Sequence, residues 1–220
     1  MSDTDSFIDE VTEEVRRDRL FALIRRYGWI AVVVIVAIVG GAAFNEYRKA
    51  RATAAAQQAG DAMIAALAVD GAAGRAERLA EIEAAAPGAQ AVVRMMTAAA
   101  LEASEDRAAA VAELEAIAAN GALERIYRDI AAFKALTLQA ETLPAAERRL
   151  AFEALAQPGA PLRVLAEEQL ALIEIAEGQT EAALERLQAI VTDAEADPAL
   201  RQRATQLIIA LGGTPQTRQG

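Results

Sequence analysis

Residues 27–44, YGWIAVVVIVAIVGGAAF, form an uncharged run around which the rest of the chain is organised. As an α-helix its 18 residues reach about 27 Å, close to the ~30 Å thickness of the hydrocarbon core of a bilayer. Val and Ile are indifferent helix formers in water, but in lipid every backbone group must be bonded within the segment. A buried helix of a water-soluble domain normally keeps some polar positions, and this run has none. We therefore predict a transmembrane helix at residues 27–44.

The flanks of the run predict its orientation. Aromatic side chains that suit the headgroup layer stand at both ends, Tyr27 and Trp29 at one and Phe44 and Tyr47 at the other. Five basic residues precede the run, namely Arg16, Arg17, Arg19, Arg25 and Arg26. Three follow it, namely Arg48, Lys49 and Arg51. Cytoplasmic flanks are enriched in Lys and Arg, and long domains are translocated largely regardless of their own charge. We expect a cytoplasmic N-terminus, with residues 45–220 outside the cytoplasm.

A cleaved signal peptide is the alternative interpretation of the same run. The small residues Gly40, Gly41, Ala42 and Ala43 close it, as a signal peptidase prefers. However, the 26 residues before the run contain seven acids, unlike a short basic leader, and the run exceeds the usual ~7–15 apolar residues. These two features favour a retained anchor, in which Gly40 and Gly41 are a tolerated pair of small residues.

Composition limits the classes of function that remain. The chain has 220 residues, 54% of them hydrophobic and only 4% aromatic, with no cysteine and no histidine. It is long enough for one globular domain after the anchor, and its alanine-rich composition favours closely packed helices. Residues 52–220 hold 14 basic and 24 acidic side chains, so this part lacks the basic surface of a nucleic-acid-binding protein.

Regular turn signals predict an all-α domain built of antiparallel helices. Residues 45–69 contain no helix stop, so the anchor is expected to continue as one long helix to Asp70-Gly71. Gly, Pro and Asn then punctuate the chain and predict helices at 75–86, 89–103, 105–119, 123–142, 145–156, 161–177, 181–194 and 198–211. No segment alternates as a strand does. We group these helices into three hairpins, 89–121, 122–157 and 161–196, followed by a capping helix.

An internal self-match supports this grouping. The spacing of Ala98, Ala110, Leu114 and Ile117 recurs 73 residues later at Ala171, Ala183, Leu187 and Ile190. Half of this interval is near the ~34-residue period of tetratricopeptide repeats, so the pattern predicts an α-solenoid of tetratricopeptide-like hairpins. A shift of 36 residues fits the middle hairpin only in part. It aligns Ala146 and Leu150, but it places Lys134 and Glu153 at positions where small and large apolar residues are expected.

The search for chemistry finds no catalytic, metal-binding or cofactor-binding site. Without histidine and cysteine, most nucleophiles, proton shuttles and metal ligands are missing. The carboxylate pairs Glu81/Glu83, Glu113/Glu115 and Glu167/Glu168 have the spacing of solvated helix faces. We expect no cofactor and no small-molecule substrate. The aromatic residues of the domain, Tyr127, Phe133 and Phe152, are expected in the core, or one of them in a concave groove.

Taken in order, the chain is predicted to comprise five parts. These are a cytoplasmic amphipathic tail (1–26), the transmembrane helix (27–44), a helical extension with a first hairpin (45–86), the tetratricopeptide-like domain (87–211) and a flexible C-terminal tail (212–220). The tail is interpreted as a helix that orients the anchor, or alternatively as a docking helix for a partner.

Most of this arrangement resembles the ancillary Sec translocon subunit family, most closely over residues 7–63. The resemblance rests on EVTEEVRRDRL, RRYGW, one apolar span, NEYRKAR and an alanine-rich helical domain. It implies a single-pass protein of the bacterial inner membrane with a periplasmic tetratricopeptide-like domain. The implied partners are the Sec translocon and periplasmic chaperones. The expected function is a non-enzymatic interaction module that aids the hand-over of secreted or envelope proteins. A scaffold for outer-membrane or cell-wall assembly is the alternative, and an envelope hydrolase is a remote third.

Overall fold

The computed structural model describes the backbone of residues 3–216 and the side chains of residues 25–27, 29–30 and 32–216. Within these ranges the chain is all-α, with no strand, as the sequence predicts. The helices are α1 (Asp3–Leu67), α2 (Ala72–Ala80), α3 (Pro87–Ala103), α4 (Arg107–Ala118), α5 (Arg125–Leu138), α6 (Ala145–Leu155), α7 (Arg163–Ala176), α8 (Thr180–Thr192) and α9 (Pro198–Ala210). They divide into two units, residues 1–55 and residues 56–220.

The first unit consists of most of α1. The helix runs without a break past residue 55 to Leu67, so the continuous helix predicted after the apolar run is confirmed. Among the described residues, no helix is long and apolar enough to cross a membrane. Gly28 and Ala31 of the predicted span lie outside the residues described at side-chain level. So do all side chains of the predicted cytoplasmic tail except Arg25 and Arg26.

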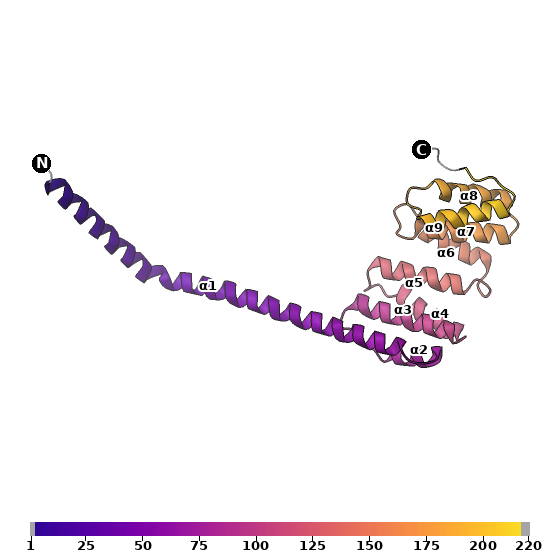
Figure 1. Ribbon diagram of the computed structural model, residues 1–220, viewed down its shortest axis with the longest axis horizontal. Coiled ribbons are helices and arrows are strands. Elements are labelled where there is room, and N and C mark those ends of the chain that lie inside the picture. Colours follow the sequence, from indigo (N-terminus) through magenta and orange to yellow (C-terminus); the bar gives the residue numbers. More distant parts are fainter. Residues whose placement is uncertain (1–2, 217–220) are drawn as a thin grey trace. The chain divides into compact units, whose positions relative to one another are not determined.

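The second unit is a packed array in which each helix contacts its neighbours in the sequence (Figure 1). Among its described residues, the core is a series of four apolar clusters, each built by successive helices. The first joins the end of α1 to α2 and α3, the second α3 to α5, the third α5 to α7, and the fourth α7 to α9. Helices α3, α5 and α7 therefore each contribute to two clusters. No single core holds the unit together, and every helix depends on its neighbours.

Two loops differ from the sequence prediction. The helix predicted at 123–142 ends at Leu138, and the other difference precedes α3. Residues 75–86 were expected to be one helix ending before Pro87, but α2 ends at Ala80 and Pro87 is the first residue of α3. Proline is well suited to this position, because its missing N–H has no helical partner there. The segment between the two helices is held by Gln90, whose side chain accepts a hydrogen bond from the Ala84 N–H at 2.7 Å and donates one to the Ile82 carbonyl at 3.4 Å.

The turns of the hairpins α3/α4 and α7/α8, which we call the outer hairpins, have the same geometry 73 residues apart. The N–H of Asp106 bonds the carbonyl of Leu101 at 3.0 Å, and the N–H of Gln179 bonds that of Glu174 at 2.8 Å. Between the helices of each turn lies one residue with positive φ, Glu105 at 68° and Gly178 at 76°. Ala98, Ala110, Leu114 and Ile117 meet in the second cluster, while Ala171, Leu187 and Ile190 meet in the fourth and Ala183 is fully buried.

The middle hairpin, α5/α6, has a different register from the one predicted. Its turn spans residues 139–144, against 104–106 and 177–179 in the outer hairpins. Alignment by the helix caps places Phe133 where the outer hairpins have Ala98 and Ala171, and Arg148 where they have Ala110 and Ala183. The shift of 36 residues was therefore wrong. Leu150 is 72% exposed, Ala146, Lys134 and Glu153 are exposed as well, and Phe152 fills the position of Leu114 and Leu187.

The large side chains of Phe133 and Arg148 explain why α5 and α6 contact each other less than the helices of the outer hairpins do. Two alanines let the outer helix pairs approach closely, whereas a phenylalanine and an arginine hold the middle pair apart. Phe133 contacts Phe152 edge to face, with 5.6 Å between the ring centroids. The Nε of Arg148 is buried and has no hydrogen-bond partner among the described residues. The middle hairpin is thus held mainly by α4 on one side and α7 on the other.

The matched turns give a stability prediction. Glycine adopts positive φ without strain, whereas another residue pays roughly 1–2 kcal/mol there. We expect Glu105→Gly to raise the free energy of unfolding by about 0.5–1 kcal/mol and Gly178→Ala to lower it by about 1 kcal/mol. Urea denaturation followed by circular dichroism measures both. A loss of stability in Glu105→Gly would show that the Glu105 side chain contributes more than its backbone strain costs.

Candidate functional site

A hollow of about 230 Å³ lies where α3, α4 and α5 meet. Helix α3 contributes Met95, Ala98, Ala99 and Glu102, α4 contributes Leu114, and α5 contributes Phe133, Lys134, Thr137 and Leu138. Leu114 and Ala98 are almost fully buried and belong to the second core cluster. Glu102, Lys134 and Thr137 are exposed. We call this hollow the α3–α5 groove.

The three aromatic residues of the domain have three different environments. Phe152 is fully buried in the third core cluster. Phe133 lines the α3–α5 groove and also contacts Phe152. Tyr127 lies over Gly88 at the start of α3, where an added Cβ would come within 2.8 Å of the tyrosine hydroxyl. Gly88 therefore permits a close contact between α3 and α5 near one end of the two helices.

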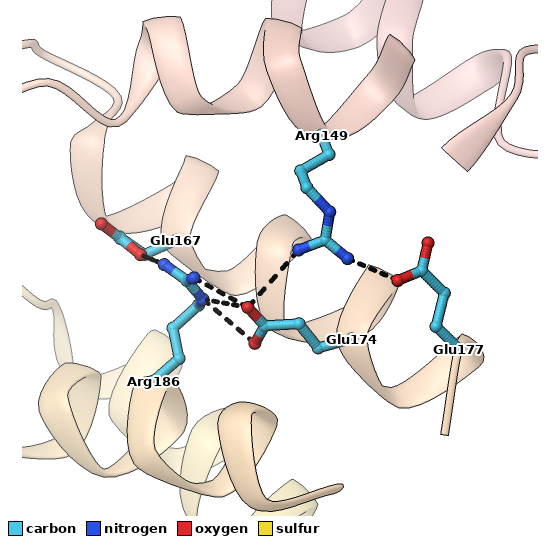
Figure 2. Close-up of polar contacts among 5 residues, drawn as sticks. All are labelled: Arg149, Glu167, Glu174, Glu177 and Arg186. Atoms are coloured by element: carbon cyan, nitrogen blue, oxygen red, sulfur yellow. Dashed lines mark hydrogen bonds and ion pairs between the residues drawn. The ribbon is translucent and has the colours of Figure 1, made fainter. Parts of the chain in front are cut away.

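A network of ion pairs joins α6, α7 and α8 (Figure 2). Its centre is Glu174 of α7, whose side chain is only 4% exposed. The carboxylate accepts hydrogen bonds from Arg186 of α8 at 2.7–3.1 Å and lies 3.6 Å from Arg149 of α6. Arg186 also pairs with Glu167, and Arg149 pairs with Glu177 at 2.6 Å. Each guanidinium thus has two carboxylate partners, one buried and one closer to solvent.

A second buried carboxylate joins α7 to α9. Glu168 accepts two hydrogen bonds from Arg203, at 2.7 and 2.8 Å, in a bidentate arrangement. Such charge-assisted pairs are stronger than neutral hydrogen bonds and fix the orientation of both groups. Hydrogen bonds with Glu174 and Glu168 raise the pKa values of Arg186 and Arg203, respectively. Both arginines are therefore charged at neutral pH.

The three glutamate pairs that were predicted to lie on solvated helix faces have three different environments. Glu81 and Glu83 are exposed, as expected. Glu113 pairs with Arg94 at 2.8 Å, and Glu115 accepts a hydrogen bond from Gln139 at 2.8 Å. The expectation was wrong for Glu167 and Glu168, because both pair with arginines of neighbouring helices and Glu168 is buried. The spacing of acids along α7 could not reveal this, since their partners come from helices later in the chain.

A hollow of about 410 Å³ lies along α7 and α8 beside this network. Its charged residues are largely occupied with one another, since Arg186 pairs with Glu167 and Glu174, and Arg163 with Asp193 at 2.8 Å and with Glu195 at 2.6 Å. A hydrogen bond from the Glu195 backbone N–H and another from Arg163 hold the pKa of the Asp193 carboxyl below its usual value. In the described part of the chain, no group of three or more acidic residues is arranged to hold a metal ion.

Three basic residues of the middle hairpin have no such partner. Its ion pairs are made by Arg125 and Arg149. Arg128, Lys134 and Arg148 take part in no ion pair within the described residues, and the Nε atoms of both arginines are buried. Lys134 is exposed at the α3–α5 groove. Arg75 and Arg201, elsewhere in the domain, form no ion pair either, but each donates a hydrogen bond to a backbone carbonyl.

The predicted membrane-interface residues all lie on α1 and are exposed. They are Tyr27, Trp29, Phe44 and Tyr47. The guanidinium of Arg26 lies 5.8 Å from the centre of the Tyr27 ring, and that of Arg51 lies 5.7 Å from the Tyr47 ring. Contacts of this kind contribute about 0.5–1 kcal/mol at exposed sites. Of the basic residues predicted to set the topology, Arg25 and Arg26 are exposed, while the side chains of Arg16, Arg17 and Arg19 lie outside the described ones.

The Glu174 network predicts a characteristic pattern of stabilities. Arg186→Met leaves a buried carboxylate with only the longer contact to Arg149, and we expect a loss of about 3 kcal/mol in the free energy of unfolding. The double variant Arg186→Met/Glu174→Leu should recover most of this loss, because Arg149 keeps Glu177 and Glu167 is partly solvated. The control is Glu185→Gln, at an exposed residue that lines the hollow along α7 and α8. It should change the free energy of unfolding little. Equal losses in the single and double variants would contradict the central role of Glu174.

Comparison of the chain with protein-family models, with curated proteins and with solved structures finds no match.

Proposed function

We propose that this protein is a membrane-anchored protein-interaction module of the bacterial inner membrane. In this proposal it is an ancillary subunit of the Sec translocon, with a cytoplasmic N-terminus and a periplasmic helical domain. It aids the hand-over of secreted or envelope proteins from the translocon to periplasmic chaperones. The proposal rests on the sequence resemblance and on the physical character of the two units.

The observation that carries the proposal is the exposure of the apolar part of α1. Every large apolar side chain described from Tyr27 to Phe44 is at least 42% exposed, and Val36 and Ile38 are more than 60% exposed. Soluble proteins rarely leave such a long apolar surface in water. A bilayer would cover it on all sides, and the aromatic and basic residues at its ends suit the headgroup layers. We therefore retain residues 27–44 as the proposed anchor.

The helical array supports the second half of the proposal. Core clusters shared only between successive helices, together with two hairpins that repeat the same turn, are typical of an α-solenoid. Solenoids of tetratricopeptide type present extended surfaces to protein partners. Anchoring such a domain to the membrane raises its effective concentration near membrane-bound partners. A chain with no histidine and no cysteine is better suited to binding than to catalysis.

A structural scaffold for outer-membrane or cell-wall assembly is the second candidate. The same anchor and array would serve it, so the two candidates differ only in their partners. The resemblance to the translocon subunit family favours the first.

The topology can be measured directly. Spheroplasts carrying the protein are treated with protease before and after lysis, with an antibody against the C-terminal part as readout. We expect degradation of residues 45–220 in intact spheroplasts, because a periplasmic domain is accessible without lysis. A cytoplasmic protein of known location is the control. Protection of the domain until the membrane is lysed would refute the proposed orientation.

The partners can be identified by purification after mild detergent extraction. We expect translocon subunits and periplasmic folding factors to co-purify with the full-length protein. Replacing residues 27–44 with an unrelated apolar span of equal length should weaken recovery of the translocon if the span itself makes contact. Recovery of cell-wall or outer-membrane assembly proteins, with no translocon subunit, would replace the first candidate with the second.

A further inference from the structure

The chain turns sharply where α9 ends. Gly212 has a φ of 81°, and its N–H donates a hydrogen bond to the Ile209 carbonyl at 3.0 Å. The N–H of Gly213 donates to the Ile208 carbonyl at 2.9 Å. These two hydrogen bonds define a Schellman motif, in which a residue with positive φ ends a helix. The motif therefore gives the residues that follow α9 a definite direction.

Residues 212–216, which we call the strap, continue from this turn. They are the first part of the segment predicted as a flexible tail, and residues 217–220 lie outside those described. Gly213 and Pro215 are partly buried, whereas the strap residues on either side of each are exposed. This period of two is typical of an extended segment with one face against a surface. Pro215 favours the same conformation, because it restricts its own φ and the backbone of Thr214.

The main chain of the strap lies close against α8 and α9 at Gly213. A Cβ added to Gly213 would lie 2.8 Å from the Leu184 Cδ2 of α8 and 3.0 Å from the Ile208 Cγ2 of α9. Ile208 belongs to the fourth core cluster, and Leu184 packs against it. Glycine allows this approach because it has no side chain. The strap therefore covers part of the apolar surface of the fourth cluster.

Gln188, one turn after Leu184 on α8, holds the other end of the strap. Its side-chain amide donates a hydrogen bond to the Gln216 carbonyl at 2.6 Å and accepts one from the Gln216 N–H at 2.9 Å. Both contacts are with the main chain, so they do not depend on the side chain at this position. Extended peptides are commonly recognised in this way, through main-chain hydrogen bonds and alternate side chains that face the surface. We call the surface formed by Leu184, Gln188 and Ile208 the strap site.

The strap is held weakly enough to be displaced. Among the described residues, the hydrogen bonds that join it to α8 are the two with Gln188. One such bond changes an equilibrium constant by only about fivefold. Covalent linkage nevertheless favours the closed state, because the effective concentration of a segment on a short linker is roughly millimolar. Opening would uncover Leu184 and Ile208 and leave the Gln188 amide free to bind another main chain.

We propose that the strap site is a binding site for an extended polypeptide segment, and that residues 212–216 occupy it within the same chain. The segment that fits has a glycine against Leu184 and Ile208 and a proline two residues later. A partner segment with this Gly-x-Pro pattern competes with the strap for the site. The inference concerns α8 and α9 and does not depend on the partners proposed above.

Fluorescence anisotropy on the full-length protein in detergent micelles tests this proposal. The probe is a fluorescein-labelled peptide with the sequence of residues 211–218, LGGTPQTR. The wild type should bind it weakly, because the strap competes. Gly213→Val, which clashes with α8 and α9, and Gln216→Pro, which lacks the N–H that Gln188 accepts, should each bind it at least tenfold more tightly. Thr214→Val, at an exposed strap residue, is the control and should bind as the wild type does.

Further variants test whether the peptide binds at the strap site. Adding Gln188→Ala to the Gly213→Val protein should weaken peptide binding at least fivefold by removing both main-chain contacts. A peptide that carries Gly213→Val should fail to bind the opened proteins, whereas one that carries Thr214→Val should bind as the parent peptide does. Circular dichroism checks that the variants keep their helix content. Gln216→Pro changes only an exposed residue after the helices, so it opens the strap without altering the core.

Three results would overturn the inference. Unchanged peptide affinity in both Gly213→Val and Gln216→Pro would show that the strap does not occupy a peptide-binding site. Equal affinity of the parent peptide and the Gly213→Val peptide would show that the glycine contact is not recognised. A peptide affinity that Gln188→Ala leaves unchanged would place the bound peptide elsewhere on the protein.

Discussion

The structure of the helical unit depends on one constraint: an inner helix must pack on both sides at once. Helix α3 gives Val93 and Ala100 to one cluster and Ala91 and Ala98 to the next. Helix α7 does the same with Ala166 and Leu170 on one face and Val164 and Ala171 on the other. A helix buried on two faces needs small residues where a neighbour crosses closely, which explains the alanine-rich composition. Because each core is shared only by successive helices, the array grows in chain order and closes no bundle.

Ion pairs between helices reinforce the packing that the separate apolar clusters provide. Glu174 connects α7 to α6 and α8, and Glu168 connects α7 to α9. A buried carboxylate is costly unless its partners are in place, so each of these pairs penalises any arrangement in which the helices shift along one another. The apolar clusters favour contact between neighbouring helices, and the ion pairs select the register of that contact. Helix α7 is the centre of both effects in the C-terminal half of the unit.

Local signals predicted most of the fold. Gly, Pro and Asn placed the helices α3 to α9 to within a few residues, and the self-match of 73 residues located the two hairpins whose turns are alike. The failures are long-range. The register of α6 depends on a longer turn at 139–144, which a single fixed shift cannot describe. The burial of Glu168 and Glu174 depends on arginines that lie 12 to 35 residues later in the chain. The sequence predicted core packing for the three aromatic residues and left a groove position for one of them as the alternative. Only the structure shows that Phe133 lines a groove.

The departures from the repeat fall together in the middle hairpin, and they share one physical consequence. Phe133 and Arg148 stand where the outer hairpins have alanines, whose small size allows two helices to approach closely. Helices α5 and α6 are therefore less tightly packed against each other than the helices of the outer hairpins. The same residue, Phe133, contacts the core residue Phe152 in an edge-to-face arrangement and also lines the α3–α5 groove. A residue too large for the repeat position thus links the core to an open apolar surface beside an unpaired cation, Lys134. The positions at which the repeat is least regular are therefore those at which the surface of the array is hollowed.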